Sequence, residues 1–372
     1  MPVPRRYVLN LADPDGPGWV HCISRCVRKA FLAGTVRGVS FEHRKQWVED
    51  RLELLARVCS VEVAAYAVMS NHLHVVVRPR PDLARRWSDQ ETAERWLRLF
   101  PGRGRLLPDG SALSPEPAQV ERIARDPDLL GKARARLSDV SWFMKLLKEG
   151  ISRRANREDE CTGSFWESRF TSVPLLDQAA LIACMAYVDL NPVRAKMCDR
   201  PERSRHTGAR QRIVARQNGR IRERIRPRGG SAAQQGKDIT SAKAAASSAP
   251  QSSHEREKEA GIWLAPMAAC TPARDPASYD ARQVAITAEQ YLSLLDLTGR
   301  VMAVGKSGRI PPELPAILKR LDLKVESWLA TMLGHRAMSV GAIGSDAARQ
   351  AEAARRGVAW VRSPASSALF AA

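Results

Sequence analysis

The stretch from Val61 to Val77 constrains the fold more than any other part of the sequence. It reads Val-Glu-Val-Ala-Ala-Tyr-Ala-Val-Met, then Ser70-Asn71, then His-Leu-His-Val-Val-Val. Two runs rich in β-branched and apolar residues that meet at a short polar pair predict two adjacent antiparallel strands. Side chains at positions i and i+2 of a strand point the same way, so we expect His72 and His74 on one face of a sheet.

Further strands and helices are expected on both sides of this hairpin. Residue type and apolar spacing predict a strand at 19–25, a helix at 41–59, a helix at 140–156, a strand at 171–174 and a helix at 178–190. Pro192 would end the last helix. This order fits an α+β fold in which helices cover one face of an antiparallel sheet and leave the other face free for a site or a ligand.

Composition divides the chain into parts. Residues 1–200 would form the main domain, with a charged, Pro-containing insertion at about 79–138. An Arg-rich tail follows at 201–228, and its charge favours nonspecific binding of polyanions. Residues 229–272 carry few large apolar side chains and predict a disordered linker. Leucine-rich spacing then predicts a small, mainly helical domain at 273–362, whose role the sequence does not indicate.

The charge of the whole chain is strongly positive. The 59 Lys and Arg residues outnumber the 40 Asp and Glu residues, which gives a formal net charge of +19. Such a field attracts polyanions, and nucleic acid leads the candidates. The sequence has no apolar stretch of a length that could span a bilayer and no secretory signal at its start. Its seven cysteines form no Cys-x-x-Cys pair, which argues against a zinc ribbon. We therefore expect a cytoplasmic protein without membrane contact.

The histidine pair allows two interpretations. Two strand histidines can simply line a sheet surface, or they can act together as metal ligands. The second interpretation gains from the helix at 178–190, because Tyr187 and Asn191 stand four residues apart and share one helix face. Imidazoles combined with an amide oxygen suit Mg²⁺ or Mn²⁺, whereas a tight zinc site would want cysteine or a third histidine.

The same residues carry a family resemblance. Met69-Ser70-Asn71-His72-Leu73-His74 resembles the Met-x-Asn-His-hydrophobic-His signature of the IS200-like and REP-associated tyrosine transposases. The segment Tyr187 to Ala195 is similar to the Tyr-x-x-x-Asn-Pro-Val-Arg-Ala block of that family. Three further segments match in the family's order: 19–31, 144–156 and 163–170. The resemblance covers about residues 15–200, interrupted by the insertion, while 273–362 looks like an extension found in longer bacterial relatives.

The resemblance implies both a fold and an activity. The fold would be the ferredoxin-like or RRM-like sheet of HUH endonucleases. A divalent ion, Mg²⁺ or Mn²⁺, would be held by His72 and His74 with Asn191 as third ligand. Tyr187 would attack the phosphate of single-stranded or hairpin DNA and form a 5′-phosphotyrosine intermediate. Such transposases act in pairs, so a homodimer at the nucleoid is expected. Two departures stand out: Ser70 replaces a proline common in relatives, and Asn191 stands where some relatives have glutamine.

Basic and aromatic residues of the matched segments are candidates for contact with the DNA backbone and bases. They are Arg25, Arg28, Lys145, Lys148, Arg153, Trp166, Arg169 and Arg194. The alternative interpretation is a solvated charged face for the basic side chains and core packing for Trp166 and Phe170.

Several other residues compete for roles in the site. Tyr66 is a second tyrosine near the histidines, but its apolar strand favours core packing. His21 fits a hydrogen-bonded sheet residue better than a ligand, and Asp189 and Glu167 fit solvated or Arg-paired carboxylates better than acid–base groups. Two further functions stay open: a domesticated, non-catalytic nucleic-acid-binding protein, and an RNA-binding module that uses the same sheet face. The second predicts stacking aromatics beside the histidines, where the sequence has aliphatic residues.

Overall fold

A computed structural model describes most of the chain up to the Arg-rich region and parts of the C-terminal third. The described residues are 18–27, 33–36, 39–102, 105, 113–225, 262–267, 284–302, 313, 325, 328–329 and 341–362. Of the predicted disordered linker, only 262–267 is described, and Arg28 lies outside the described residues.

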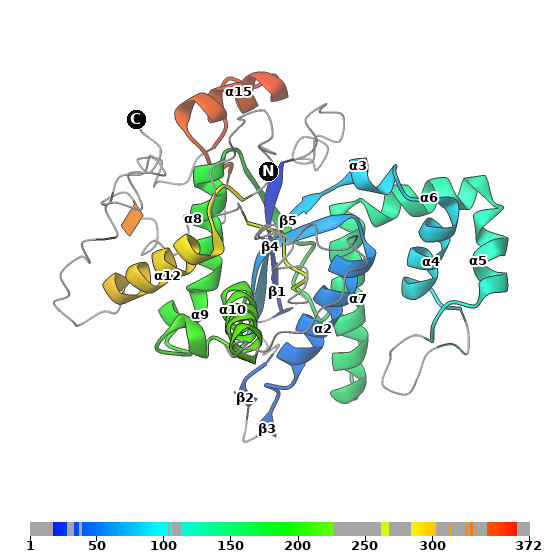
Figure 1. Ribbon diagram of the computed structural model, residues 1–372, viewed down its shortest axis with the longest axis horizontal. Helices are drawn as coiled ribbons and strands as arrows, with labels where there is room; N and C mark the ends of the chain where they lie inside the picture. The colour runs from blue at the N-terminus through cyan, green and yellow to red at the C-terminus, as the bar shows by residue number, and fades with distance from the viewer. Residues whose placement is uncertain are drawn as a thin grey trace, which may run out of the picture.

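A four-stranded antiparallel sheet forms the centre of the molecule (Figure 1). Its strands, in spatial order, are β4 (Val61–Val68), β5 (His72–Pro79), β1 (Trp19–Arg25) and β6 (Thr171–Leu175). Strands β4 and β5 pair from Val68 opposite Leu73 outward, which confirms the predicted hairpin. A separate small hairpin joins β2 (Thr35–Val36) to β3 (Val39–Ser40).

Helices cover both faces of this sheet. Helices α2 (Arg44–Val58) and α7 (Val140–Glu158) share an apolar core with Val20, Leu73 and Val75. Helix α8 (Gln178–Asp189) shares another core with Val76 and Val173 on the opposite face. In Figure 1 the sheet is seen between these two layers. The α+β class is therefore confirmed, whereas the expectation that helices cover only one face is wrong.

The reason lies in the composition of α8. Ala180 to Asp189 are all buried, so the helix has no polar side to turn toward water. A helix that is apolar all round needs partners on every side. The sheet supplies one partner, and residues of the C-terminal third, including Tyr291, Leu294 and Trp328, supply the other.

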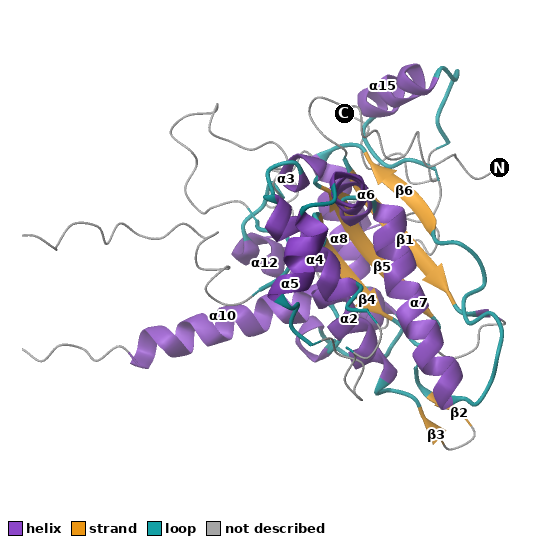
Figure 2. Cartoon of the chain, turned by 90° about the vertical axis from the view of Figure 1, so that its right-hand side faces the viewer, coloured by secondary structure: helices purple, strands orange, loops and turns teal. Residues whose placement is uncertain are grey.

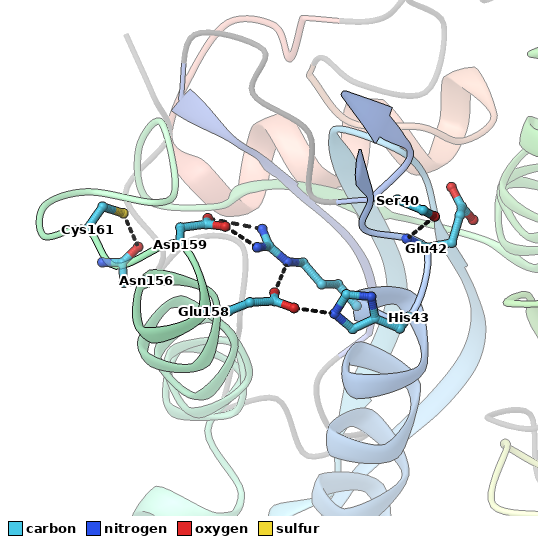
Figure 3. A network of polar contacts seen from close by, with 8 residues as sticks. Ser40, Glu42, His43, Asn156, Glu158, Asp159 and Cys161 are labelled. Atoms are coloured by element: carbon cyan, nitrogen blue, oxygen red, sulfur yellow. Dashed lines mark hydrogen bonds and ion pairs between the residues drawn. The ribbon is translucent and has the colours of Figure 1, made fainter. Parts of the chain in front are cut away.

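The two helices of the other layer are joined at their ends by ion pairs. Arg44, whose side chain is 2% exposed at the start of α2, donates to Glu158 at 2.6 Å and also to Asp159. Nε2 of His43 lies 2.5 Å from the same Glu158 (Figure 3). Two carboxylates at the end of α7 thus compensate one buried guanidinium, which fixes the ends of the helices against each other.

The predicted insertion is helical. Between β5 and α7 lie α3 (Pro81–Ala84), α4 (Asp89–Leu99), α5 (Pro117–Ala124) and α6 (Pro127–Leu137). Ser88 caps α4 and Asp126 caps α6 through side-chain hydrogen bonds to backbone N–H groups. A small cluster around Leu97 and Ile123 forms their shared core.

The chain after α8 includes helices that pack against α8 and β4. It forms α9 (Asn191–Arg194), η2 (Pro201–Arg203), α10 (Gly208–Ile225), α12 (Ala288–Met302) and α15 (Asp346–Arg356). Much of the predicted Arg-rich tail is thus the helix α10, which extends away from the body of the molecule in Figure 2. The described part of the predicted C-terminal domain shares the core of α8.

Helix α10 begins in close contact with β4. A Cβ atom on Gly208 would lie 3.3 Å from Cα of Ala65 and 3.3 Å from Oδ1 of Asp189, so a glycine allows this approach. The register of β4 shifts between Val63 and Ala65. Arg212, which is 3% exposed, donates to the carbonyl of Ala64 inside this bulge at 3.0 Å. The bulge and the helix are therefore fixed together.

Candidate functional site

Three histidines share one face of the sheet. In the β1–β5 register Arg25 lies opposite His72, Ile23 opposite His74, and His21 opposite Val76. Directly opposed residues of an antiparallel pair face the same side. The rings of His72 and His74 lie 4.8 Å apart, and the ring of His21 stacks on His74 at 5.1 Å. The histidine pair expected from the hairpin is thus formed, with His21 as a neighbour.

Each of the two histidines that are predicted to bind a metal has one ring nitrogen next to a polar partner. Nδ1 of His72 lies 2.6 Å from Oδ1 of Asn71, which can only accept, so Nδ1 carries the proton and Nε2 keeps its lone pair. Nδ1 of His74 lies 2.9 Å from Nε2 of His21. With Nδ1 of His74 as the donor, its Nε2 is likewise left as a ligand atom. Metal-binding histidines have this kind of partner on the second nitrogen.

Both predicted ligands are held in the neutral form. Burial lowers the pKa of His72 to about 4, and the charges of Arg25 and Arg194 act in the same direction. Burial also lowers the pKa of His74 well below its usual range, with smaller contributions from His21 and His72. Metal ions bind the unprotonated imidazole, so neither histidine has to lose a proton at neutral pH.

The end of α8 brings Tyr187 to the histidines of the same chain. Its ring centroid lies 6.0 Å from that of His74 and 6.4 Å from that of His21. The guanidinium of Arg194 lies 4.5 Å from the centre of the phenol ring. One of its N–H groups donates to the phenolic oxygen at 3.1 Å and to Oδ1 of Asn191 at 3.3 Å. The tyrosine, the amide and the arginine therefore form one connected group beside the histidines.

Two hydrogen-bond donors in this group are unused. Nη1 of Arg194 and Nδ2 of Asn191 are buried and have no hydrogen-bond partner within the part of the chain that the structure describes. Buried donors of this kind are rare because each costs about 1 to 3 kcal/mol. Both atoms are therefore candidate donors for a bound anion.

The donor set fits a divalent ion that also takes oxygen ligands. Among the described residues, no group of three or more His, Cys, Asp or Glu side chains is placed to hold a metal ion. The chain thus offers two neutral imidazoles and the amide of Asn191, and further oxygens would come from water or a phosphate. Because Oδ1 of Asn191 accepts a hydrogen bond from Arg194, its assignment as third ligand stays a prediction.

Four of the residues expected to contact DNA gather at another place. Lys145, Lys148, Trp166 and Arg169 line a pocket of about 590 Å³ on α7, together with Trp142 and Phe170. Trp166 and Phe170 are 7% and 8% exposed, which favours core packing over base stacking. Trp142 is more accessible, and the ammonium of Lys145 lies 4.4 Å from its ring centre. Sequence reasoning did not single out Trp142.

The pocket on α7 and the histidine face are linked through the end of β1. Cys26 and Trp166 form a β-bridge, and the backbone N–H of Glu167 donates to the carbonyl of Arg25 at 2.9 Å. Arg25 is exposed, and its charge acts on His72. Arg153 is exposed on α7 and pairs with Glu149. The basic residues that we expect to contact DNA thus lie on both faces of the sheet, near the end of β1.

The competing residues have other positions. Tyr66 is fully buried in the core of α2 and α7, away from the histidine face, and its hydroxyl donates to Glu49 at 2.7 Å. Asp189 is fully buried, so it is not solvated. It accepts from the hydroxyl of Tyr291 at 2.6 Å and forms no ion pair with an arginine among the described residues. Burial raises the pKa of Asp189 to about 6. Glu167 is exposed.

Comparisons with known proteins identify no relative of this chain. Neither protein-family models, nor curated proteins, nor solved structures give a match to this chain. Among the described residues, no helix combines the length and the apolar character that crossing a bilayer requires.

Proposed function

We propose that this protein is a single-strand DNA endonuclease and strand transferase of the tyrosine HUH type, with Tyr187 as nucleophile. The observation that carries the proposal is the phenol of Tyr187 beside two neutral histidines and two unused buried donors, on Arg194 and Asn191. A phosphodiester is the anionic substrate that such donors, a nucleophile and metal-ligating imidazoles suit together. The net charge of +19 favours a polyanion as its carrier.

The chemical step requires a phenol, a phosphate and a leaving oxygen in line. The oxygen of Tyr187 forms a bond to phosphorus while the bond from phosphorus to the 3′-oxygen breaks. The phenol loses one proton and the departing 3′-oxygen gains one, which gives a 5′-phosphotyrosine and a free 3′-hydroxyl. The phosphotyrosine ester conserves the energy of the phosphodiester bond that was broken. A second 3′-hydroxyl can therefore reverse the reaction and rejoin the strand.

The residues around Tyr187 position these groups. Arg194 fixes the phenolic oxygen through one N–H and has Nη1 available for a phosphate oxygen. Nδ2 of Asn191 is a second donor for the same phosphate. His72 and His74 would hold Mg²⁺ or Mn²⁺, which supplies Lewis-acid polarisation of the phosphoryl oxygens when bound.

Tyr187 and the two histidines lie together in one chain. Tyr187 lies next to the histidines of its own sheet, so a second copy is not needed to supply a nucleophile. We therefore propose that the tyrosine acts in cis. The homodimer expected from the family resemblance stays a prediction.

Covalent capture of DNA tests the function. Purified protein is incubated with end-labelled single-stranded hairpin DNA and Mn²⁺ and then analysed by denaturing electrophoresis. A slowly migrating, covalent protein–DNA band is expected for the wild type. It is also expected for Tyr66→Phe, because the hydroxyl that this variant removes lies in the core of α2 and α7. The band should be lost in Tyr187→Phe. Its persistence in Tyr187→Phe would refute the mechanism, and DNA binding without any adduct would favour the non-catalytic, domesticated binder.

A further inference from the structure

A second pocket lies apart from His21, His72 and His74. It encloses about 740 Å³ between the start of α2, the turn around η2 and the first turns of α10. This volume is within the range of small-molecule and cofactor sites. Pro192 and Met197 contribute to its wall, whereas Asn191, Tyr187 and His72 are not among its lining residues.

The base of the pocket is a buried hydrogen-bond network. The carboxylate of Glu49 is 7% exposed and accepts from Tyr66 at 2.7 Å, from Gln211 at 2.5 Å and from Nδ1 of His206 at 2.6 Å. Burial alone would raise the pKa of Glu49, but hydrogen bonds from His206, Tyr66 and Gln211 lower it overall. The carboxylate is therefore ionised at neutral pH and holds its three partners in place.

This network fixes the orientation of His206. A carboxylate oxygen only accepts, so Nδ1 of His206 carries the proton. Nε2 is then the ring nitrogen that remains for a ligand, on a residue that lines the pocket. A ligand with a hydrogen-bonding group can bind there.

The rim of the pocket is cationic. Lys45, Arg203, Arg205 and Arg210 line it, against the two carboxylates of Glu42 and Glu49. Lys45 pairs with Glu42 at 2.6 Å, and Arg203 pairs with Asp199 at 3.1 Å. Within the described residues, Arg205 and Arg210 form no ion pair. Their guanidinium groups can therefore bind a phosphate.

Part of the wall is apolar. Val68, Pro192, Met197 and Val214 line it, and Met197 is 40% exposed. Such a surface fits a sugar or the face of a base. The pocket thus combines two guanidiniums that form no ion pair among the described residues, an oriented imidazole and an apolar surface, within a volume that fits a nucleotide.

We propose that this pocket binds a nucleoside phosphate, with the phosphate at Arg205 and Arg210 and a polar group of the base at Nε2 of His206. The ligand is either a free nucleotide or one nucleotide of a bound strand. The second source rests on the proposed function, because a strand that reaches Tyr187 would pass over α9 to enter the pocket. The first source is independent of it.

A charge-matched pair of double variants tests the proposal. Arg205→Gln/Arg210→Gln removes two charges from the pocket. Arg98→Gln/Arg122→Gln removes two charges from exposed positions on α4 and α5. Each is titrated with the four deoxynucleoside 5′-monophosphates by calorimetry, and with a short fluorescent single-stranded oligodeoxynucleotide by anisotropy. All titrations use the Tyr187→Phe background, so that no covalent adduct forms.

The pocket variant should bind at least about tenfold more weakly than its parent, because hydrogen bonds to a charged group are lost. The control variant should stay within about twofold. A loss with the monophosphates identifies a free-nucleotide site, and a loss with the oligodeoxynucleotide alone identifies a site for one nucleotide of a strand. Equal affinities of the two variants, or no binding of either probe by the parent, would overturn the proposal. Covalent capture by wild-type protein is scored separately and does not decide this outcome.

Discussion

At the scale of single residues, the geometry of the candidate site depends on what the ring nitrogens of His72 and His74 contact. The sequence predicted His72, His74 and Tyr187 because strand alternation and helix spacing place them on defined faces. It could not predict that His21 would bond to His74, since this contact depends on the register between β1 and β5. Glu49 and His206, which meet across 157 positions, were missed for the same reason.

The role of Asn71 is testable. Its Oδ1 fixes the tautomer of His72, so Asn71→Ala should slow metal-dependent adduct formation by roughly 10- to 100-fold, as is usual for second-layer partners of metal ligands. Adduct formation is followed over time at several Mn²⁺ concentrations. Asn156→Ala, which changes an amide at the end of α7, serves as control. Equal rates for both variants would show that Asn71 does not orient the ligand.

Glu49 gives the fold a pH dependence of known sign. Its pKa is lowered from 4.5 in the folded protein, mainly through the hydrogen bonds that outweigh burial. The folded state therefore binds this proton less readily than the unfolded state does. The associated stability is present above about pH 4.5 and is lost as the pH falls through the lowered pKa. Urea unfolding at several pH values should show this loss in the wild type and a weaker loss in Glu49→Gln. Identical pH profiles would contradict the assignment.

At the scale of elements, the sequence predicted the pieces better than their layering. The strands at 19–25 and 171–174 and the helices at 140–156 and 178–190 are present nearly as expected. The single-layer arrangement failed because α8 is buried along nearly its whole length and packs on the second face of the sheet. Its run Ala-Ala-Leu-Ile-Ala-Cys-Met-Ala-Tyr-Val has no polar side and requires a cover on both faces.

The contact between α8 and α12 includes one buried hydrogen bond. The hydroxyl of Tyr291 donates to Oδ2 of Asp189 at 2.6 Å, and both side chains are fully buried. Tyr291→Phe leaves the carboxyl with one partner fewer, which should lower the free energy of unfolding by about 1 to 3 kcal/mol. Chemical denaturation monitored by tryptophan fluorescence measures this change. An unaltered unfolding curve would mean that the bond does not stabilise the fold.

At the scale of the whole molecule, described residues of the C-terminal third belong to the structure that holds Tyr187. Tyr291, Leu294, Trp328 and Ile343 pack in the same core as Tyr187 and the rest of α8. The sequence predicted a separate domain there, because the break at 229–272 resembles a linker. Composition indicates where a chain is polar, but it does not show which surfaces meet across such a break.

Truncation tests this dependence. A chain that ends at Arg228 would expose the outer side of α8 to water, and exposed apolar patches of this kind cause aggregation. We expect it to lose cooperative thermal unfolding and to elute as aggregate in size-exclusion chromatography. A truncated chain that remains monomeric, with the unfolding midpoint of the full chain, would show that the C-terminal residues are dispensable for the core.

We propose that Tyr187 becomes covalently linked to DNA at a metal site made by His72 and His74. The most direct test of this proposal is to map the modified residue. Wild-type protein and His72→Ala are incubated with hairpin DNA, with Mn²⁺ or with EDTA, then digested with nuclease and trypsin and analysed by mass spectrometry. The proposed mechanism predicts a nucleotide on Tyr187 in the wild type with Mn²⁺, and none with EDTA or in His72→Ala. A nucleotide on any other residue, or the same modification without metal, would contradict it.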